Sequence, residues 1–338
     1  MSGVPKTDRL WPWVRYYLEH HLPVHRGGRA NTQATYRAAF RRLREYLYFR
    51  FGRRAASDLT LEAVDPQLVL DFLGWLQTPE GGRNGASTRN ARLATLRSFF
   101  RCLELYCPAG ERPRWQRLRL LPDKRTPKPV AQHLEVHEMD QVFAQTDPSR
   151  PIGLRDLALL AVLYNTGARA SEVAGLQRHD LTFGESPMAR FRCKGGREHR
   201  CPLWPATVLL LRRYLDETGT TTGPVFLNQR GGRLTRSGIA RRVAHYVGHA
   251  GDAMPSLRTK RLSTHSFRHS TAIHLLESGA DMHVIKAWLG HRSTRSTDHY
   301  LDLNLQNQRE LLSRFAPPSQ LKGLMEQSED NENWLDSL

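Results

Sequence analysis

A stretch rich in proline and basic residues divides this chain, and each half has to bury its own apolar residues. Residues 110–129 read GERPRWQRLRLLPDKRTPKP and hold four prolines and seven lysines or arginines against two acids. Proline restricts the backbone and removes hydrogen-bond donors, so this composition predicts an extended basic linker at 113–129. The 338 residues are also long for one core. We therefore predict an N-terminal domain over 1–112, a second domain over 130–322 and an acidic tail at 323–338.

The N-terminal half has the apolar spacing of a helix bundle. Tyr36, Phe40, Leu43 and Leu47 recur on one stripe, as do Leu93, Leu96, Phe100 and Leu103 further along. Proline favours the first position of a helix and serine favours the cap, so Pro66 and Ser87 are expected helix starts. The pattern predicts four helices, at residues 11–22, 32–49, 66–77 and 87–106.

The second half is predicted to be mostly helical with one small sheet. Helices are expected near 133–146, 153–167, 168–176, 207–218, 236–250, 265–279 and 281–290. Gly167, Gly279 and Gly290 are the expected stops of three of them, because glycine accepts the left-handed conformation that follows many helices. Two short runs flank Gly195 and Gly196, which predicts a β-hairpin with a two-residue turn. The predicted fold is mainly α, with an α+β second domain.

The charge of the chain indicates a polyanionic partner. Lys and Arg number 50 against 33 Asp and Glu, a formal net charge of +17, and the sequence pI is about 10.3. This excess favours nucleic acid, although a ribosome-associated or merely basic protein has the same composition. Arginine, which dominates, can fork onto phosphate with two parallel hydrogen bonds. The residues expected to contact DNA in the N-terminal half and linker are Arg37, Arg41, Arg89, Arg97, Arg117 and Arg119, although a plain bundle with solvated arginines fits equally well.

Cysteine usage and hydropathy indicate a cytoplasmic protein. Cys102, Cys107, Cys193 and Cys201 are too few for a disulfide framework and lack CxxC spacing, so reduced thiols are expected. Cys193 and Cys201 could face each other across the hairpin. No apolar run reaches the length of a membrane span, and MSGVPKTDRL lacks a signal-peptide core. We expect a location in the bacterial cytoplasm or nucleoid.

Polar residues gather at the ends of the predicted elements in the second half. Arg169 follows the Gly167 stop, and Lys194 lies at the hairpin tip. His265 and Arg268 open a helix. Two more, His291 and Tyr300, follow the Gly290 stop. Helix ends and turns project side chains toward a common surface, so these positions are candidates for one site.

Four segments in this order resemble the tyrosine recombinase (phage integrase) family: TGARASEV, KGGREHRCPL, HSFRH and LGHRSTRSTDHY. The tyrosine follows the LGH histidine by nine residues, and the resemblance covers essentially the whole second domain. STRNARLATLRSFFRCL also resembles the last helix of the family's N-terminal core-binding, SAM-like domain. The segment before the tyrosine holds Ser296 and Thr297 where the family often has two threonines, which is a mild departure.

The resemblance implies that Tyr300 attacks a DNA phosphodiester and forms a covalent 3′-phosphotyrosine intermediate. Arg169, Arg268 and His291 would stabilise the phosphorane, each donor contributing roughly 3 kcal/mol. Lys194 is the implied general acid and His265 the implied base or proton relay. Glu172 would orient these groups. No cofactor or divalent metal is expected: His265 and His269 have the i, i+4 spacing of a zinc helix, but Ser266 stands where a zincin needs glutamate.

Rival functions remain open. Residues 280–297 read like a helix-turn-helix, which would suit a non-enzymatic DNA-binding regulator, but such a protein has no need of Arg169, Lys194 and Arg268. A type IB topoisomerase would use the same chemistry without synapsis. Within the family, integration, excision or transposition of a mobile element is favoured over chromosome-dimer resolution.

The expected partners are a double-stranded recombination site, a homotetramer on paired sites and possible accessory DNA-bending proteins. Residues 323–338, GLMEQSEDNENWLDSL, contain five acids without a lysine or arginine. Family resemblance implies that a segment after the tyrosine packs on a neighbouring protomer. We expect Trp334, Leu335 and Leu338 to make that contact, whereas a solvated acidic tail is the alternative.

Overall fold

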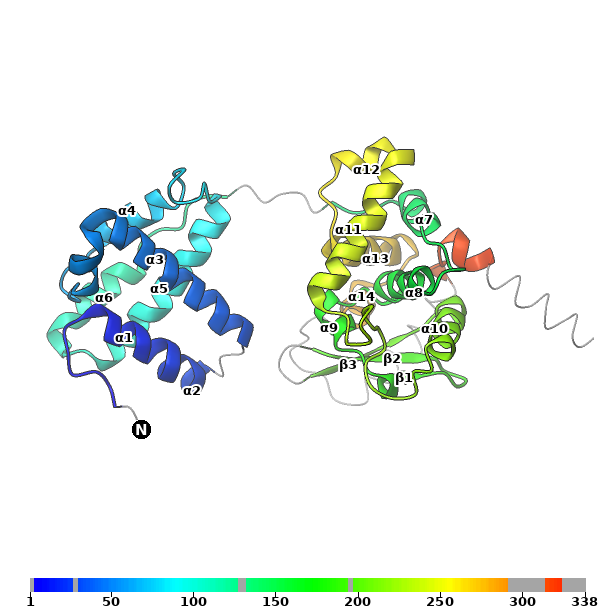
Figure 1. Ribbon diagram of the computed structural model, residues 1–338, viewed down its shortest axis with the longest axis horizontal. Helices are drawn as coiled ribbons and strands as arrows, with labels where there is room; N and C mark the ends of the chain where they lie inside the picture. Colours follow the sequence, from blue (N-terminus) through cyan, green and yellow to red (C-terminus); the bar gives the residue numbers. More distant parts are fainter. Residues whose placement is uncertain (1–2, 27–29, 127–131, 194–196, 291–313, 324–338) are drawn as a thin grey trace, which may run out of the picture. The chain divides into compact units, whose positions relative to one another are not determined.

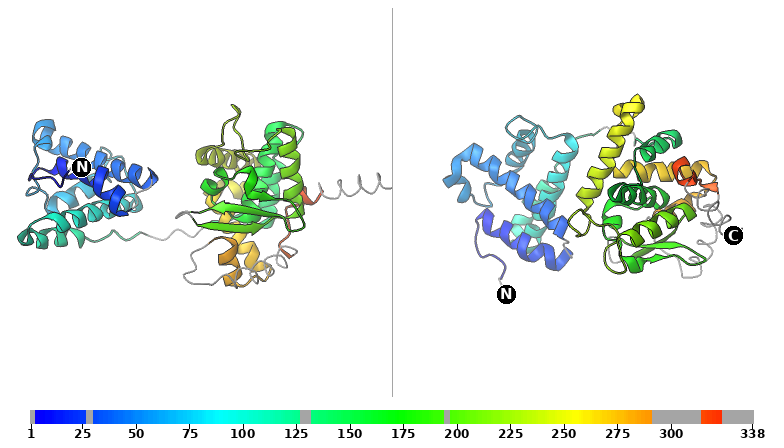
Figure 2. Two further views of the ribbon diagram at one scale, coloured as in Figure 1. Left: turned by 90° about the horizontal axis from the view of Figure 1, so that it is seen from below. Right: turned by 45° about the vertical axis from the view of Figure 1, so that its right-hand side comes forward.

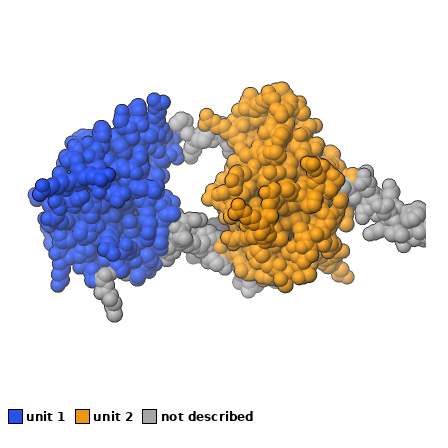
Figure 3. All heavy atoms as spheres, viewed as in Figure 1, with its two compact units in different colours: residues 1–129 blue, residues 130–338 orange. Residues whose placement is uncertain are grey.

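Two separate hydrophobic cores form, one on each side of residue 129, and the chain clusters into two compact units, 1–129 and 130–338 (Figure 3). The computed structural model describes residues 3–26, 30–126, 132–193, 197–290 and 314–323. Within these ranges no helix is long and apolar enough to cross a membrane.

Unit 1 is a helix bundle (Figure 1). Its elements are α1 (Leu10–Tyr16), a π-helical turn (Tyr17–His21), α2 (Leu22–Arg26), α3 (Ala30–Ser57), α4 (Pro66–Trp75), α5 (Ala86–Tyr106), a 3₁₀ turn (Ala109–Glu111) and α6 (Arg112–Arg119). The four predicted helices are all present, and both apolar stripes face the core, although Tyr36 is only partly buried. Pro66 is the first residue of α4, where the Asp65 carboxylate accepts the backbone N–H of Leu68 at 2.7 Å. Helix α5 begins one residue before Ser87, with Gly85 at the cap position, so the expected serine cap is wrong.

Residues 112–121 differ from the predicted extended linker. Helix α6 covers Arg112–Arg119, and its Trp115 and Leu118 are fully buried in the core of unit 1. Trp115 stacks on Phe100 with ring centroids 6.1 Å apart. Pro113 lies in the first turn of α6, where a missing N–H costs no hydrogen bond. The burial of Trp115 and Leu118, which are three residues apart and share one face of the helix, therefore outweighed the proline and charge content and made this segment helical.

Unit 2 surrounds one buried helix, α8 (Pro151–Thr166), in which every residue from Gly153 onward is buried. A three-stranded antiparallel sheet in the order β1 (Leu181–Thr182), β2 (Met188–Arg192) and β3 (Glu198–Pro202) lies along one side of the helices (Figures 1 and 2). The remaining elements are α7 (Val136–Ala144), α9 (Ala170–Ala174), a 3₁₀ turn (Arg178–Asp180), α10 (Pro205–Glu217), α11 (Arg236–Ala253), α12 (Pro255–Thr259), α13 (Thr264–Glu277) and α14 (Met282–Trp288).

The hairpin between β2 and β3 differs in detail from the prediction. The backbone N–H of Cys193 donates to the carbonyl of Arg197 at 2.7 Å, which encloses three residues rather than two. Cys201 pairs with Ala189 across the ladder, so it does not face Cys193. All four cysteines are free thiols, as expected. The tip of the hairpin, residues 194–196, lies outside the described residues.

We predict that Trp115→Ala destabilises unit 1 by about 3–5 kcal/mol, because it removes a fully buried indole. Hydrogen–deuterium exchange should become faster across α5, against which α6 packs. Leu120→Ala is the matched control, since Leu120 is 80 % exposed in the same segment. Equal exchange in the two variants would mean that α6 does not stabilise the bundle.

Candidate functional site

The end of α8 places Arg169 at the surface of unit 2. Gly167 ends the helix in the left-handed conformation, with φ of 59°, as predicted from the sequence. A Cβ at this position would lie 2.4 Å from Leu289 Cδ2, so the site also requires glycine for close packing against the end of α14. The chain then reverses, and Arg169 becomes the residue before α9.

Glu172 holds Arg169 at both its backbone and its side chain. One carboxylate oxygen accepts a hydrogen bond from the backbone N–H of Arg169, and the other accepts one from Nη1 of its side chain, each at 2.8 Å. The Glu172 side chain is 6 % exposed, whereas that of Arg169 is 41 % exposed. The contact expected from the three-residue spacing is therefore present, and it fixes one edge of a guanidinium that solvent can still reach.

Arg268 is the most buried cation of this region, at 7 % exposure. It lies in the first turns of α13 and donates from Nη1 to the carbonyl of Gly167 and from Nη2 to the carbonyl of Leu289, both at 2.7 Å. Burial first, and then the positive charge of Arg169, lower the pKa of Arg268 to about 10. A group with that pKa is still protonated at neutral pH, so two mutually repelling cations remain here and favour an anion between them.

His265 lies beside these arginines as the second residue of α13. Its pKa is lowered by partial burial first, and then by the charges of His269, Arg268, Arg169 and Arg236. The imidazole is therefore biased toward its neutral form, which can accept a proton. In the described part of the chain, no three histidine, cysteine or acidic side chains cluster as a metal site.

Sequence reasoning missed two further neighbours of this site. Arg236, the first residue of α11, contributes to the positive field at His265, and its place at a helix start was the available signal. Just after β2, burial first, and then the charge of Glu172 and a hydrogen bond with it, raise the pKa of Cys193. The hairpin tip that carries Lys194 therefore continues from a residue in contact with Glu172.

Lys194, His291 and Tyr300 lie outside the described residues. His291 directly follows Gly290, which has a φ of 63° just beyond α14, so the predicted glycine stop is present. The described residues thus bring together Arg169, Glu172, His265 and Arg268. His274, by contrast, is a core residue whose Nδ1 is 2.7 Å from the Tyr164 hydroxyl.

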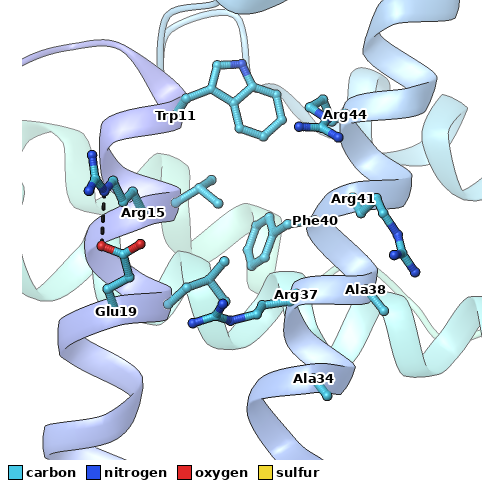
Figure 4. A pocket seen from close by; sticks show the side chains of 11 residues that line it. Trp11, Arg15, Glu19, Ala34, Arg37, Ala38, Phe40, Arg41 and Arg44 are labelled. Carbon is cyan, nitrogen blue, oxygen red and sulfur yellow. Dashed lines mark hydrogen bonds and ion pairs between the residues drawn. The ribbon is translucent and has the colours of Figure 1, made fainter.

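Unit 1 has a basic groove of about 630 Å³ between α1 and α3 (Figure 4). Trp11, Phe40 and neighbouring aliphatic side chains line its apolar part. The arginines lining it are Arg15, Arg37, Arg41 and Arg44, and the one acidic lining residue is Glu19, which accepts from Arg15 Nε at 3.0 Å. Arg37 and Arg41 are exposed, as their assignment to DNA requires.

Three of the other arginines assigned to DNA have partners inside unit 1. Arg89 is 8 % exposed and donates to the carbonyl of Pro122 at 3.1 Å. Arg97 donates to the carbonyl of Leu121 and pairs with Asp123, and Arg119 pairs with Glu104. Arg89 and Arg97 hold the segment after α6 against the bundle, and Arg119 links α6 to α5, which the charge pattern alone did not indicate. The sixth, Arg117, is exposed.

Comparison with known proteins gives the same family for both units. The Phage integrase family matches residues 132–307, and the Phage integrase, N-terminal SAM-like domain family matches residues 15–105. A putative integrase/recombinase y4rC of Sinorhizobium fredii is 33 % identical over 93 % of this chain and 94 % of its own. Tyrosine recombinase XerC of Pelobacter propionicus is 32 % identical over 88 % of this chain and 93 % of its own.

Among solved structures, a lambda integrase tetramer bound to a Holliday junction has a similar fold. Its TM-score is 0.59 at 16 % identity, and the match covers 86 % of this chain and 79 % of the other. At this identity the likeness concerns the fold alone.

Proposed function

Since the chain belongs to the phage integrase family of tyrosine recombinases, which are DNA strand-transferring enzymes, we propose that Tyr300 is the nucleophile of its site-specific recombination reaction. The tyrosine oxygen attacks a backbone phosphorus, the bond to the 5′-oxygen breaks, and a 3′-phosphotyrosine forms. Rejoining reverses these steps with another 5′-hydroxyl. The covalent bond retains the energy of the phosphodiester, so the reaction consumes no nucleotide.

The cationic pair of unit 2 is the observation that carries this proposal. Arg169 and Arg268 repel each other, yet both are held in place by contacts to Glu172 and to two helix-end carbonyls. Such preorganised donors stabilise a phosphorane because it carries more negative charge than the substrate phosphate. His291 is assigned a further hydrogen bond to the same oxygens.

Proton transfer is assigned to two other residues. Lys194 protonates the departing 5′-oxygen, and His265 accepts the proton of the tyrosine hydroxyl. The lowered pKa of His265 supports its role, because a general base has to be neutral before the reaction. Glu172 orients Arg169, as its two hydrogen bonds to that residue suggest.

Double-stranded DNA is the substrate, and unit 1 is its clamp. Arg37 and Arg41 of the basic groove are the best supported phosphate contacts, because both are exposed. Arg117 is also available, whereas Arg89, Arg97 and Arg119 would have to exchange internal partners. We assign the protein to the bacterial cytoplasm or nucleoid, where its substrate is.

The biological role is proposed to be movement of a mobile element, by integration, excision or transposition. One relative is named an integrase/recombinase and another XerC, at nearly equal identity, so chromosome-dimer resolution is the alternative. Inverted repeats or an attachment site flanking the gene would support the first role, and their absence would favour the second. Accessory DNA-bending proteins belong to the same proposal.

Tyr300→Phe should bind the recombination site normally but form no covalent adduct, because it lacks the attacking hydroxyl. The measurement is a denaturing gel after incubation with a suicide substrate whose cleaved product diffuses away. A shifted band from the phenylalanine variant would refute the assignment of Tyr300. Tyr48→Phe is a matched control that should cleave as the wild type does, since this tyrosine belongs to α3 of unit 1.

Lys194→Ala should be inactive on ordinary DNA but cleave a substrate with sulfur at the 5′ bridging position almost as fast as the wild type. A thiolate leaves without protonation, so the general acid becomes dispensable. Single-turnover rates on the two substrates test this. Arg268→Ala is the comparison, because loss of phosphorane stabilisation should slow both substrates. Equal defects of Lys194→Ala on both would indicate a binding role instead.

We further propose that the active assembly is a homotetramer on paired sites, joined through the tail. A lambda integrase of similar fold has been solved as a tetramer bound to a Holliday junction. Residues 324–338 lie outside the described residues, and their sequence combines five acids with Trp334, Leu335 and Leu338. Acidic and apolar side chains suit a basic neighbouring protomer, docked head-to-tail around a ring.

Truncation after Leu321 should leave binding to a single site unchanged and reduce tetramer assembly on paired sites. Native gel shifts with one-site and two-site DNA measure the two steps separately. A truncated protein that synapses and recombines like the full chain would show that the tail is solvated. Replacing Trp334, Leu335 and Leu338 by serine should reproduce the truncation while keeping the tail charge.

A further inference from the structure

His199 of β3 connects the hairpin to the end of α14. Its Nε2 lies 2.6 Å from the carbonyl oxygen of Trp288, across 89 residues of sequence. Its ring stacks on Phe191, the residue opposite it in the ladder, with an interplanar angle of 25°. The imidazole is thus fixed from two directions, by a cross-strand ring and by the backbone of α14.

The tautomer of His199 follows from its partner. A carbonyl oxygen only accepts, so Nε2 must carry the proton and donate it. Nδ1 is buried and has no hydrogen-bond partner among the described residues. Burial lowers the pKa of His199 and outweighs the hydrogen bond to the Trp288 carbonyl and the charge of Glu172, which both raise it, while the charges of Arg268 and Arg169 act in the same direction as burial. The ring is therefore neutral and acts as a single fixed donor.

Gly290 completes the contact from the other side. Its φ of 63° is a conformation that favours glycine, and a Cβ built there would lie 3.0 Å from Cγ of the His199 ring. The imidazole ring therefore lies close to Gly290, the residue that precedes His291. An added methyl group at Gly290 would have to displace the ring.

His199 and Arg268 together fix the last turn of α14. His199 donates to the carbonyl of Trp288, and Arg268 donates to the next one, that of Leu289. Carbonyls at a helix C-terminus lack partners within the helix, so side-chain donors determine how this end is held. Arg268 ties it to α13 and α8, whereas His199 ties it to the hairpin.

We propose that His199 is a positioning residue for strand cleavage, holding the hairpin that carries Lys194 in register with the turn that carries His291. The inference rests on the proposed function, because it assigns the general acid and one phosphorane donor to the two segments that His199 joins. His199 itself touches no reacting atom. Without its N–H, the two segments lose their direct polar link, and both catalytic groups can move relative to the phosphate.

The test compares three substitutions that differ in the reach of the donor. His199→Gln places an amide N–H near the position of Nε2. His199→Asn carries the same amide one carbon shorter, so it does not reach the Trp288 carbonyl. His199→Phe keeps the ring and removes the donor. His137→Phe, on an exposed histidine of α7, is the control for histidine replacement elsewhere in unit 2.

The readouts are the Kd for a single site and the single-turnover rate of covalent adduct formation at saturating suicide substrate. We expect unchanged Kd values for all variants. His199→Asn and His199→Phe should cleave roughly 10²-fold more slowly, the scale of a 1 Å misplacement of a reacting group. His199→Gln should recover most of the rate, and His137→Phe should match the wild type.

Three results would overturn the inference. They are a wild-type rate in His199→Phe, equal rates in the glutamine and asparagine variants, or a defect that appears in Kd rather than in the cleavage rate. The glutamine–asparagine comparison decides the matter even if His199→Phe does not fold, because these two differ only in reach. A wild-type protein that forms no adduct would instead refute the proposed function and leave the contact of His199 unexplained.

Discussion

The two hydrogen bonds of Arg268 are the interaction on which the catalytic unit depends. A buried guanidinium without partners would be strongly destabilising, and here two helix-end carbonyls, those of Gly167 and Leu289, accept from it. The same contacts satisfy backbone oxygens that α8 and α14 cannot pair internally. One side chain thereby joins the ends of three helices, and the segments that leave those ends carry the candidate site.

Electrostatic strain follows from this arrangement. Arg268 has a lowered pKa because it is buried and faces the charge of Arg169, while Glu172 compensates part of that charge. Burial is the main reason that the pKa values of His265 and His199 are lowered, and the charges of Arg268 and Arg169 act in the same direction. The repulsion between the two cations favours an anion at this site, and both guanidinium groups are already held in place by their protein partners.

Much of the fold could be read from local patterns. Apolar residues at helical spacing located most helices of both units, though not α6 and α12, and Gly167, Gly279 and Gly290 marked three ends correctly. The errors were at places where tertiary packing outweighed composition. The burial of Trp115 and Leu118 makes a proline- and arginine-rich segment helical. Arg89 and Arg97 point inward and donate to backbone carbonyls, which a count of charged residues does not reveal.

The sequence by itself determined which side chains are available to the site and at which helix ends and turns they lie. It could do so because helix capping and apolar periodicity depend on residues only three or four positions apart. Only the tertiary structure decided which of them meet. Arg268 reaches a carbonyl 101 residues away, and His199 reaches one 89 residues away. Contacts of this range depend on how the cores pack, so neither the anchoring of Arg268 nor the link made by His199 could be inferred from spacing along the chain.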